Sequence, residues 1–375
     1  MTATELVRII HDTPQKAVLA ITGGGAEAIG ELLRHGNGSK TLLEAVVPYD
    51  QNAFDDFVKG KPDKYCSPEA ARDLAMAAYM RAAKLTGTFD KVVGVGASCS
   101  LAKEGERTGR KHVVHIAVQT CARTDTFNYE ITASREDEEK FAADRILDAL
   151  AGACGLNNWI VPTLQTQNQK INCTMAPEWA SSVIREQITH YTVKINPATK
   201  TKLLLPGAFN PVHDRHLEMA HVAHKLKGEH VDFELCVKNV DKSPLNFHEI
   251  ETRHQQLELA LREHSWAGNL HFTNTPTFAK KAELFPGTTF VIGFDTFQRI
   301  GDLKYYDGDP AKRFQAIDKI RLLGCKFLVF HRIVNGRRTS ELDVVFLPAE
   351  LVALAEVVPE SELTPNDTSS SGIRK

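Results

Sequence analysis

Two stretches of the chain share one pattern, in which a short apolar run is followed by a turn containing glycine and then by apolar residues at helical spacing. The first stretch covers residues 17–34 and the second covers residues 202–226. A buried strand that turns through glycine into an amphipathic helix is the opening unit of α/β nucleotide-binding layers. The pattern therefore predicts two separate α/β units.

The first half of the chain continues with short runs rich in β-forming residues and with two longer helical patterns. The helix expected from Ser67 carries Pro68 and Glu69 in its first turn, which are residue types that begin and cap helices. The expected strands are residues 17–21, 43–47, 92–95 and 113–118, and the expected helices are residues 26–34, 67–85 and 136–153. These elements predict a core that belongs to this half alone.

The hydrophobic pattern weakens around residues 156–200, where Asn, Gln, Thr and Pro are scattered around one helical stretch at 177–188. We therefore expect a first domain at residues 1–155, a linker at 156–200 and a second domain at 201–375. In the second domain the expected strands are residues 202–205, 233–237, 270–272, 289–292 and 326–330, separated by helical patterns such as 213–226 and 248–264. This alternation predicts a parallel sheet flanked by helices.

Composition and charge exclude several classes of protein. The 375 residues are 42% hydrophobic and 25% charged, which allows more than one packed core and excludes wholesale disorder. The formal net charge of −2 provides no broad basic surface for nucleic acid or anionic membranes. There is no apolar run of about 18 residues, and Glu5 and Arg8 interrupt the place where a signal peptide needs an apolar core. We expect a cytoplasmic protein with neither nucleic acid nor membrane as a partner.

The cysteines do not indicate a stabilising framework. Seven cysteines, an odd number without a Cys-x-x-Cys pair, are typical of neither a disulfide scaffold nor a zinc site. We expect no metal site built from them. Cys99 and Cys121 have no neighbours in sequence that would activate a thiol.

The segment Gly-Ala-Phe-Asn-Pro-Val-His-Asp-Arg-His at residues 207–216 carries the most chemical information. Gly207 lacks a side chain, so backbone N–H groups there could approach a phosphate. His213 and His216 lie at the start of the next helix, where unpaired amides and the helix dipole favour negative charge. Both imidazoles can reach one anion, which suits a triphosphate. A capped core helix with two ordinary histidines is the alternative interpretation of such a pair.

With three later segments, this motif makes residues 202–375 resemble the nucleotidyltransferases with a Rossmann-like fold, especially the nicotinamide or nicotinate mononucleotide adenylyltransferases. Phe-Val-Ile-Gly-Phe-Asp at 290–295 is similar to the family strand that ends in Gly-x-Asp. Lys-Phe-Leu-Val-Phe-His-Arg at 326–332 is similar to a later strand that ends in a basic residue. Thr-Ser-Ser-Ser-Gly-Ile-Arg at 368–374 is similar to the family element that holds the triphosphate.

The resemblance implies transfer of AMP from ATP, with Mg²⁺, to nicotinamide or nicotinate mononucleotide and release of pyrophosphate. It implies catalytic roles for His213, His216 and Arg374. It also implies ATP-binding roles for Gly207, Ala208, Phe209, Asn210, Gly293, Asp295, Ser369, Ser370 and Ser371. The Asn-Pro pair at 210–211 and the terminal serines favour adenylyl over cytidylyl transfer, because cytidylyltransferases differ from this chain at both places.

The chemistry of this reaction is intelligible from the residues themselves. The phosphate of the attacking mononucleotide is already ionised, so it needs no strong base. Positioning, together with cations or donors at the α-phosphate and the departing pyrophosphate, should supply the catalysis. Lys238 and Lys242 could add charge there, although a solvated loop is an equal alternative. For Arg253, a structural role and a substrate contact have equal weight.

Two features depart from the family pattern. Arg215 stands where the family has glycine between the histidines, and it could either contact a phosphate or obstruct the nucleoside. The sequence ends one residue after Arg374, where family members usually continue with a helix, so we expect the loop to be ordered only with ligand bound. These departures motivate the alternative of a non-catalytic nucleotide-binding or regulatory protein.

Residues 1–155 resemble the C-terminal domain of CinA proteins, whose active members deamidate nicotinamide mononucleotide. The matching segments are Leu-Ala-Ile-Thr-Gly-Gly-Gly at 19–25, Val-Val-Pro-Tyr at 46–49, Ser-Pro-Glu-Ala-Ala at 67–71, and Val-Gly-Val-Gly-Ala at 93–97 followed by 113–119. Active members carry a serine and a lysine where this chain has Ala20 and Phe54. Alanine cannot attack or hydrogen-bond an amide, so residual deamidase activity is improbable.

We also expect a nucleotide site in this first domain, although there is an alternative interpretation of its glycine turn. The residues that could hold a mononucleotide phosphate are Thr22, Gly23, Gly24 and Tyr49. A glycine turn that serves only the fold has equal weight, because such turns are common in proteins. The sequence decides neither between nicotinamide and nicotinate nor between a monomer and a homo-oligomer.

Overall fold

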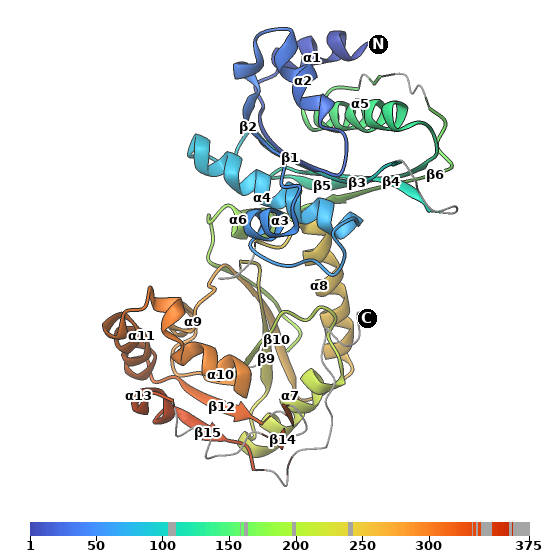
Figure 1. The fold of residues 1–375 in the computed structure, drawn as a ribbon. Coiled ribbons are helices and arrows are strands. Elements are labelled where there is room, and N and C mark those ends of the chain that lie inside the picture. The colour runs from blue at the N-terminus through green and yellow to red at the C-terminus, as the bar shows by residue number, and fades with distance from the viewer. Residues whose placement is uncertain are drawn as a thin grey trace. The chain divides into compact units, whose positions relative to one another are not determined.

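The computed structural model describes residues 1–103, 110–157, 159–160, 164–196, 200–238, 243–331, 333–334, 337–338, 347–359 and 362 (Figure 1). The chain divides into two compact units. Unit 1 comprises Met1–Arg185 and Asp241–Ile250, and unit 2 comprises Glu186–Val240 and Glu251–Lys375.

Unit 1 contains a six-stranded mixed sheet with the order β2-β1-β3-β4-β5-β6. β1 pairs in parallel with both β2 and β3, whereas β3 to β6 pair antiparallel with one another. The strands are β1 Lys16–Thr22, β2 Leu42–Val46, β3 Val92–Ser100, β4 His112–Gln119, β5 Arg123–Ile131 and β6 Asn168–Met175.

Helices cover both faces of this sheet. α1, α2 and α5 pack together on one face, and α4 packs on the other, as Figure 1 shows. The helices of unit 1 are α1 Ala3–His11, α2 Glu27–Arg34, the 3₁₀ turn η1 Gly38–Lys40, α3 Gln51–Val58, α4 Pro68–Thr86, α5 Arg135–Ala153 and α6 Glu178–Ile184. The main core of the unit lies between the sheet and the layer of α1, α2 and α5.

Local sequence explains where the main elements of unit 1 begin and end. Residues 17–21 of β1 are all buried, as expected for a strand between two parallel neighbours with helices on both faces. The hydroxyl of Ser67 accepts from the backbone N–H of Ala70 at 3.1 Å and caps α4, which ends at Gly87 in the left-handed conformation.

Unit 2 contains a seven-stranded sheet with the order β15-β12-β11-β8-β9-β10-β7. All neighbours are parallel except β7, which pairs antiparallel with β10 at one edge. The strands are β7 His190–Val193, β8 Leu203–Pro206, β9 Val231–Cys236, β10 Ala267–Thr273, β11 Thr289–Gly293, β12 Lys326–Phe330 and β15 Ala355–Val357, with β13 Ile333–Val334 and β14 Arg337–Arg338 as a separate pair. From β10 to β12 the order is 3-2-1-4-5, which is that of the doubly wound Rossmann fold.

The helices of unit 2 also form two layers (Figure 1). α7 and α8 lie on one face of the sheet, and α9, α10 and α11 lie on the other. The helices are α7 Asp214–Lys227, α8 Phe247–Arg262, α9 Phe278–Leu284, α10 Phe294–Gly301, the 3₁₀ turn η2 Leu303–Tyr306, α11 Pro310–Leu322 and α13 Ala349–Val352. Residues 247–250 at the start of α8 belong to unit 1. A phenylalanine-rich core fills the space between the sheet and the second layer.

The architecture confirms the predicted fold class, but residues 156–200 differ from the expected linker. They supply β6 to the sheet of unit 1, and they supply α6 and then β7, which pairs with β10 in unit 2. β6 escaped the sequence pattern because it is a short, mostly exposed strand at the edge of the sheet in which polar residues predominate. In the described parts of the chain, no helix is both long and apolar enough to cross a membrane.

Candidate functional site

The carboxyl ends of β8 and β11 mark the place in unit 2 where the fold itself favours a ligand. From β8 the chain moves outward through β9 and β10, and then returns to the other side of β8 as β11. In an open parallel sheet, a crevice forms outside the carboxyl ends of the strands at such a reversal. β8 ends at Pro206 and β11 ends at Gly293, so the segment 207–216 and Asp295 follow directly at this edge.

Gly207 is required by close packing. A Cβ atom at this position would lie 2.6 Å from the ring of Phe209. The N–H of Gly207 donates to the carbonyl of Glu234 at 3.0 Å, so it extends the pairing of β8 with β9. The expected approach of a phosphate to this N–H is therefore not met, because the sheet already uses the donor.

Phe209 packs against the ring of His216. Its side chain is buried, and its backbone has a φ of 44°, in the left-handed region. The ring centroid lies 5.6 Å from that of Phe233 and 4.9 Å from that of His216, in an edge-to-face contact with the imidazole. Phe209 thus contributes packing that places His216.

Arg253 of α8 contacts the backbone of the segment 207–216. Only 7% of this arginine is exposed, and its Nη1 donates to the carbonyl oxygen of Ala208 at 3.1 Å. Ala208 itself is exposed, and the half-buried Asn210 is joined to Pro211 by a cis peptide bond. The structural interpretation of Arg253 is therefore supported by a direct hydrogen bond to the loop.

His213 and His216 lie against each other at the start of α7. His213 is the N-cap residue, and the two ring centroids are 3.8 Å apart with an interplanar angle of 27°. The backbone N–H of His213 donates to Nδ1 of His216 at 3.4 Å. Because Nδ1 of His216 accepts, its ring proton belongs on Nε2. Nδ1 of His213 is buried without a hydrogen-bond partner among the described residues.

Both imidazoles are neutral at neutral pH. Burial, followed by the neighbouring His213, lowers the pKa of His216 to about 3. Burial also lowers the pKa of His213, and the Arg215 guanidinium adds to this effect while Asp214 opposes it. Without a ligand, the pair therefore presents N–H donors, and an arriving anion would raise both pKa values.

Arg215 is held to the protein on the α7 side of the site. Its Nη1 lies 2.8 Å from Glu218 Oε2, one helical turn further on, and its Nη2 donates to the carbonyl of His331 at 3.3 Å. His331 directly follows β12, so the arginine links the first turn of α7 to the end of that strand. In this arrangement the Arg215 charge is partnered by a carboxylate of the same helix.

The other expected residues of unit 2 divide into three groups. Gly293 is the N-cap of α10, and the partly exposed Asp295 lies in its first turn. Lys238, after β9, forms an ion pair with Glu186. The expected positions outside the described residues are Lys242, Ser369, Ser370, Ser371 and Arg374.

The candidate residues of unit 1 also follow two parallel strands at one edge of a sheet. β1 ends at Thr22 and β2 at Val46, and these strands are paired in parallel. Gly23 has a φ of 79°, and a Cβ there would lie 1.9 Å from the carbonyl oxygen of Cys99 on β3. Tyr49, by contrast, is 69% exposed. Close approach to β3 thus accounts for Gly23 without a ligand.

The surroundings of this turn do not favour a phosphate. A Cβ on Gly24 would lie 2.3 Å from the Leu101 side chain and 3.2 Å from Oε2 of Glu139. That oxygen is buried, has no hydrogen-bond partner among the described residues, and lies 3.8 Å from the guanidinium of Arg135. Ala20 is fully buried, and Phe54 packs edge-to-face on Tyr65 with ring centroids 5.4 Å apart.

Comparisons with known proteins match each half separately. Residues 204–375 match the family described as cytidylyltransferase-like. The second half of this chain is a cytidylyltransferase-like domain. It makes the protein a nucleotidyltransferase. No curated protein matches the chain.

Solved structures resemble both halves at low identity. The competence/damage inducible protein CihA from Agrobacterium tumefaciens is 18% identical, with a TM-score of 0.33 over 42% of this chain and 96% of that one. A CinA superfamily protein from Escherichia coli is 18% identical, with a TM-score of 0.33 over 40% of this chain and 88% of that one. The nicotinic acid mononucleotide adenylyltransferase of Plasmodium falciparum, complexed with NaAD, is 17% identical, with a TM-score of 0.32 over 47% of this chain and 83% of that one.

In the cytidylyltransferase-like domain, a buried ion pair next to Gly207 was not expected from the sequence. Nζ of Lys281, on α9, lies 2.6 Å from Oε1 of Glu234, and each side chain is at most 5% exposed. The same oxygen accepts from the hydroxyl of Thr273 on β10. Glu234 thus anchors α9 and β10 through its side chain while its carbonyl holds Gly207. The available signal was the pair of acidic residues, Asp232 and Glu234, alternating with apolar ones in a buried strand.

In the described part of the cytidylyltransferase-like domain, the imidazole N–H donors could bind a nucleotide phosphate, whereas few side chains there could bind a metal ion. No group of three or more His, Cys, Asp or Glu side chains among the described residues could hold a metal ion. Asp295 is a carboxylate at the carboxyl edge of the sheet. Magnesium in nucleotide sites is commonly held by one or two carboxylates together with substrate phosphates, and this donor set is compatible with that arrangement.

Proposed function

We propose that the protein transfers AMP from ATP to nicotinamide or nicotinate mononucleotide and releases pyrophosphate. The observation that carries this proposal is the stacked pair His213 and His216 at the start of α7, directly after the central strand of a 3-2-1-4-5 sheet. Ordered N–H donors at the amino end of a 14-residue helix suit a polyphosphate. The cytidylyltransferase-like match restricts the chemistry to nucleotidyl transfer.

The two histidines would act as oriented donors in this reaction. The attacking phosphate is already an anion, so the protein has to place it in line with the α-phosphate and stabilise the charge that builds on the leaving pyrophosphate. His216 presents Nε2–H, because its Nδ1 accepts from the backbone of His213. Its orientation is set by the buried Phe209, which is in turn carried by a loop bonded to Arg253. Preorganised donors of this kind cost no reorganisation when the charge develops.

Mg²⁺ belongs to the proposal as a companion of ATP. It would neutralise charge on the phosphates, and Asp295 is the carboxylate of this edge that could contact it. The choice of ATP over CTP rests on Asn210-Pro211 and on the serines at 369–371, whose residue types match the adenylyltransferases.

For unit 1 we propose weak binding of a related mononucleotide without hydrolysis of its amide. Ala20 offers no hydroxyl, and Phe54 is buried where active CinA proteins have a lysine. The Glu139 carboxylate beside Gly24 opposes a phosphate at the turn, so binding there is expected to be weak.

The proposal is tested by incubating the protein with Mg²⁺, one nucleotide and one acceptor, and measuring pyrophosphate. We expect release with ATP and either mononucleotide, and little with CTP. Pyrophosphate formed with CTP and not with ATP would contradict adenylyl transfer and would indicate cytidylyl transfer instead. No pyrophosphate with any combination would favour the alternative of a nucleotide-binding protein without catalysis.

A further inference from the structure

Lys238 forms an ion pair with Glu186, and both residues belong to unit 2. The lysine follows the last residue of β9 by two positions. The N–H of Gly207 is bonded to the carbonyl of Glu234 on the same strand. Lys238 thus lies at the carboxyl edge of the sheet from which the segment 207–216 also emerges, which is the edge that binds ligands in sheets of this kind.

The order of the strands relates Lys238 to one of the two reactants. β9 and β11 flank β8 on opposite sides. Asp295, for which a role in ATP binding is expected, follows β11, whereas Lys238 follows β9. The two reacting phosphates would meet between them, where His213 and His216 begin α7 after β8. Under the proposed function, on which this inference rests, Lys238 is placed for the phosphate of the acceptor mononucleotide.

Glu186 reaches this edge because β7 runs opposite to the other strands of the sheet. In the antiparallel pairing of β7 with β10, His190 lies opposite Thr273, so β7 begins where the parallel strands end. The backbone N–H of Asn274 donates to the carbonyl of Thr189 at 3.1 Å and fixes the chain just before β7. The topology thus brings Glu186, three residues earlier, to the carboxyl edge.

The two members of this ion pair differ in exposure. The side chain of Lys238 is 19% exposed, whereas that of Glu186 is 58% exposed. The carboxylate can turn into water at little cost, and the ammonium group then stays at the edge of the sheet. An exposed pair of this kind adds little to stability, so the fold does not depend on it.

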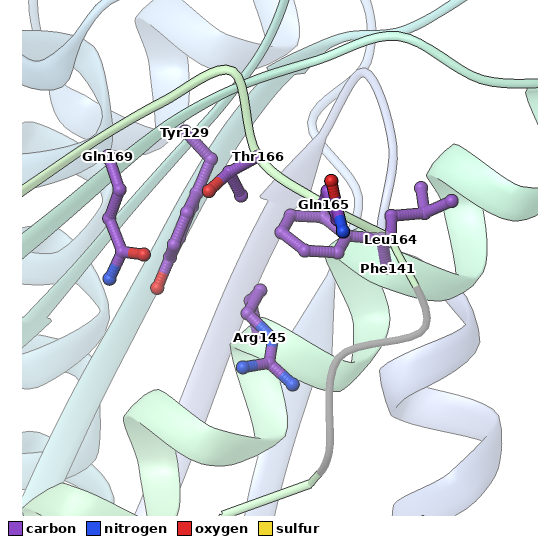
Figure 2. A pocket seen from close by; sticks show the side chains of 7 residues that line it. All are labelled: Tyr129, Phe141, Arg145, Leu164, Gln165, Thr166 and Gln169. Carbon is purple, nitrogen blue, oxygen red and sulfur yellow. The ribbon is translucent and has the colours of Figure 1, made fainter.

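Arg145 of unit 1 shows the opposite arrangement. It lines a cavity of about 620 Å³, and its side chain is 10% exposed (Figure 2). Its guanidinium lies 2.9 Å from the carboxylate of Asp148, which is 4% exposed, and donates to the carbonyl of Ile160 at 2.7 Å. Both partners are buried in the fold, so an arriving anion could not displace them. The carboxylate beside Lys238, by contrast, can be displaced.

We propose that Glu186 competes for Lys238 and that the phosphate of the acceptor mononucleotide displaces it on binding. A phosphate monoester carries a charge of about −1.5 to −2 near pH 7 and three acceptor oxygens, against a single charge on the carboxylate. It is therefore the stronger partner for an ammonium group. Because the ion pair has to open first, the acceptor binds less tightly than it would to an unpaired lysine.

Steady-state kinetics of the full chain test this competition, with saturating ATP and Mg²⁺ and a varied concentration of the mononucleotide. Glu186→Gln removes the charge and keeps the length of the side chain. It should lower the KM for the mononucleotide by up to about fivefold, the range expected for an exposed ion pair, with little change in kcat or in the KM for ATP. Glu229→Gln is the matched control, because Glu229 pairs with Lys202 just before β8, and it should leave all three constants unchanged.

A double-mutant cycle shows whether the effect passes through the lysine. Lys238→Met, with its fold verified by thermal unfolding, should raise the KM for the mononucleotide. Adding Glu186→Gln to Lys238→Met should then change this KM no further. An equal decrease of KM by Glu186→Gln with and without Lys238 would overturn the proposal, because the carboxylate would then act independently of the lysine.

Calorimetric titration with the mononucleotide in the absence of ATP separates this inference from the proposed function. Glu186→Gln should bind the mononucleotide up to about fivefold more tightly than the unmodified protein, and Lys238→Met should bind it more weakly. This pattern without pyrophosphate release in the kinetic assay would refute the proposed function and keep the competition. Pyrophosphate release with an unchanged KM and affinity in Glu186→Gln would overturn the competition alone. Absence of saturable binding to all three proteins would also overturn it.

Discussion

β1 of unit 1 and β8 of unit 2 occupy equivalent places, since each has parallel neighbours on both sides and each leads into a segment that begins with glycine. In both segments the fold requires the glycine, because a Cβ at Gly23 would meet β3 and one at Gly207 would meet the Phe209 ring. The surroundings then diverge. After β8 the chain presents His213 and His216 at a helix start, whereas β1 is followed by Glu27 in the first turn of α2. The buried Oε2 of Glu139, on α5, lies beside Gly24.

The difference teaches that a glycine turn at the carboxyl edge of a sheet does not by itself identify a phosphate site. What distinguishes the two places is the sign and the hydrogen-bonding capacity of the side chains around the turn. Imidazole donors favour an anion, and carboxylates oppose one. On this basis we propose that the reacting phosphates bind in the cytidylyltransferase-like domain and that unit 1 catalyses no analogous step.

The largest effect is expected for His216→Ala. Loss of one preorganised donor aimed at developing charge should lower turnover by about a hundredfold or more, which corresponds to about 3 kcal/mol. Pyrophosphate release at saturating ATP measures this loss. His221→Ala, which removes an exposed histidine of the same helix, is the matched control and should keep turnover near that of the unmodified protein. Near-normal turnover of His216→Ala would remove this histidine from the reaction.

The second effect concerns the dependence of stability on pH. Folding lowers the pKa of His216 from 6.5 to about 3, so between these values the unfolded chain binds more protons than the folded one. The contribution of His216 to stability must then fall as the pH drops below about 6.5. His216→Asn removes this contribution, so denaturant unfolding should show the unmodified protein losing up to about 2 kcal/mol more than the variant between pH 7 and pH 5. Parallel losses in the two proteins would show that folding leaves the pKa of His216 unchanged.

A smaller effect is expected for Arg215→Gly, which restores the residue type found between the histidines in the adenylyltransferases. Because Arg215 is bonded to Glu218 and to the carbonyl of His331, its removal should change turnover only a few-fold. Glycine in the first turn of α7 should cost about 1 kcal/mol of stability. A large gain in turnover would instead show that the arginine obstructs the substrate, and a large loss would show that it binds a phosphate.

The smallest effect is expected at the turn of unit 1. The protein should release no ammonia from nicotinamide mononucleotide, and Ala20→Ser should not change this, since Phe54 still replaces the lysine of active CinA proteins. An ammonia assay over long incubation checks both proteins. Ammonia release by the unmodified protein that is lost in Tyr49→Ala would show that unit 1 is catalytic. The two glycine turns would then both belong to active sites.

Local patterns in the sequence predicted the parts of the fold that depend on neighbouring residues. The apolar run before Gly207, the histidines three positions apart and the helix that follows are all contiguous, and the structure contains that strand and helix. The alternation of strands and helices also predicted a parallel sheet flanked by helices, because parallel strands are joined by crossover connections that are usually helical.

The supporting contacts could not be predicted, because they join residues that are far apart in the chain. Arg253 donates to the carbonyl of Ala208, and Lys281 on α9 pairs with Glu234 on β9. Arg215 left two interpretations open for the same reason, since its partner at His331 lies at the end of a distant strand. β6 was missed because its short apolar alternation, Ile171, Cys173 and Met175, lies in a mostly polar and exposed segment.

The central claim is tested most directly by identifying the product formed from ATP, Mg²⁺ and a pyridine mononucleotide. Mass spectrometry of the mixture should show a dinucleotide in which AMP is joined to the mononucleotide through a pyrophosphate bridge, formed in equal amount to the released pyrophosphate. The product should require both substrates and should fall about a hundredfold or more with His216→Ala. Pyrophosphate release without a dinucleotide, or a dinucleotide formed equally well by His216→Ala, would contradict the assignment of this site.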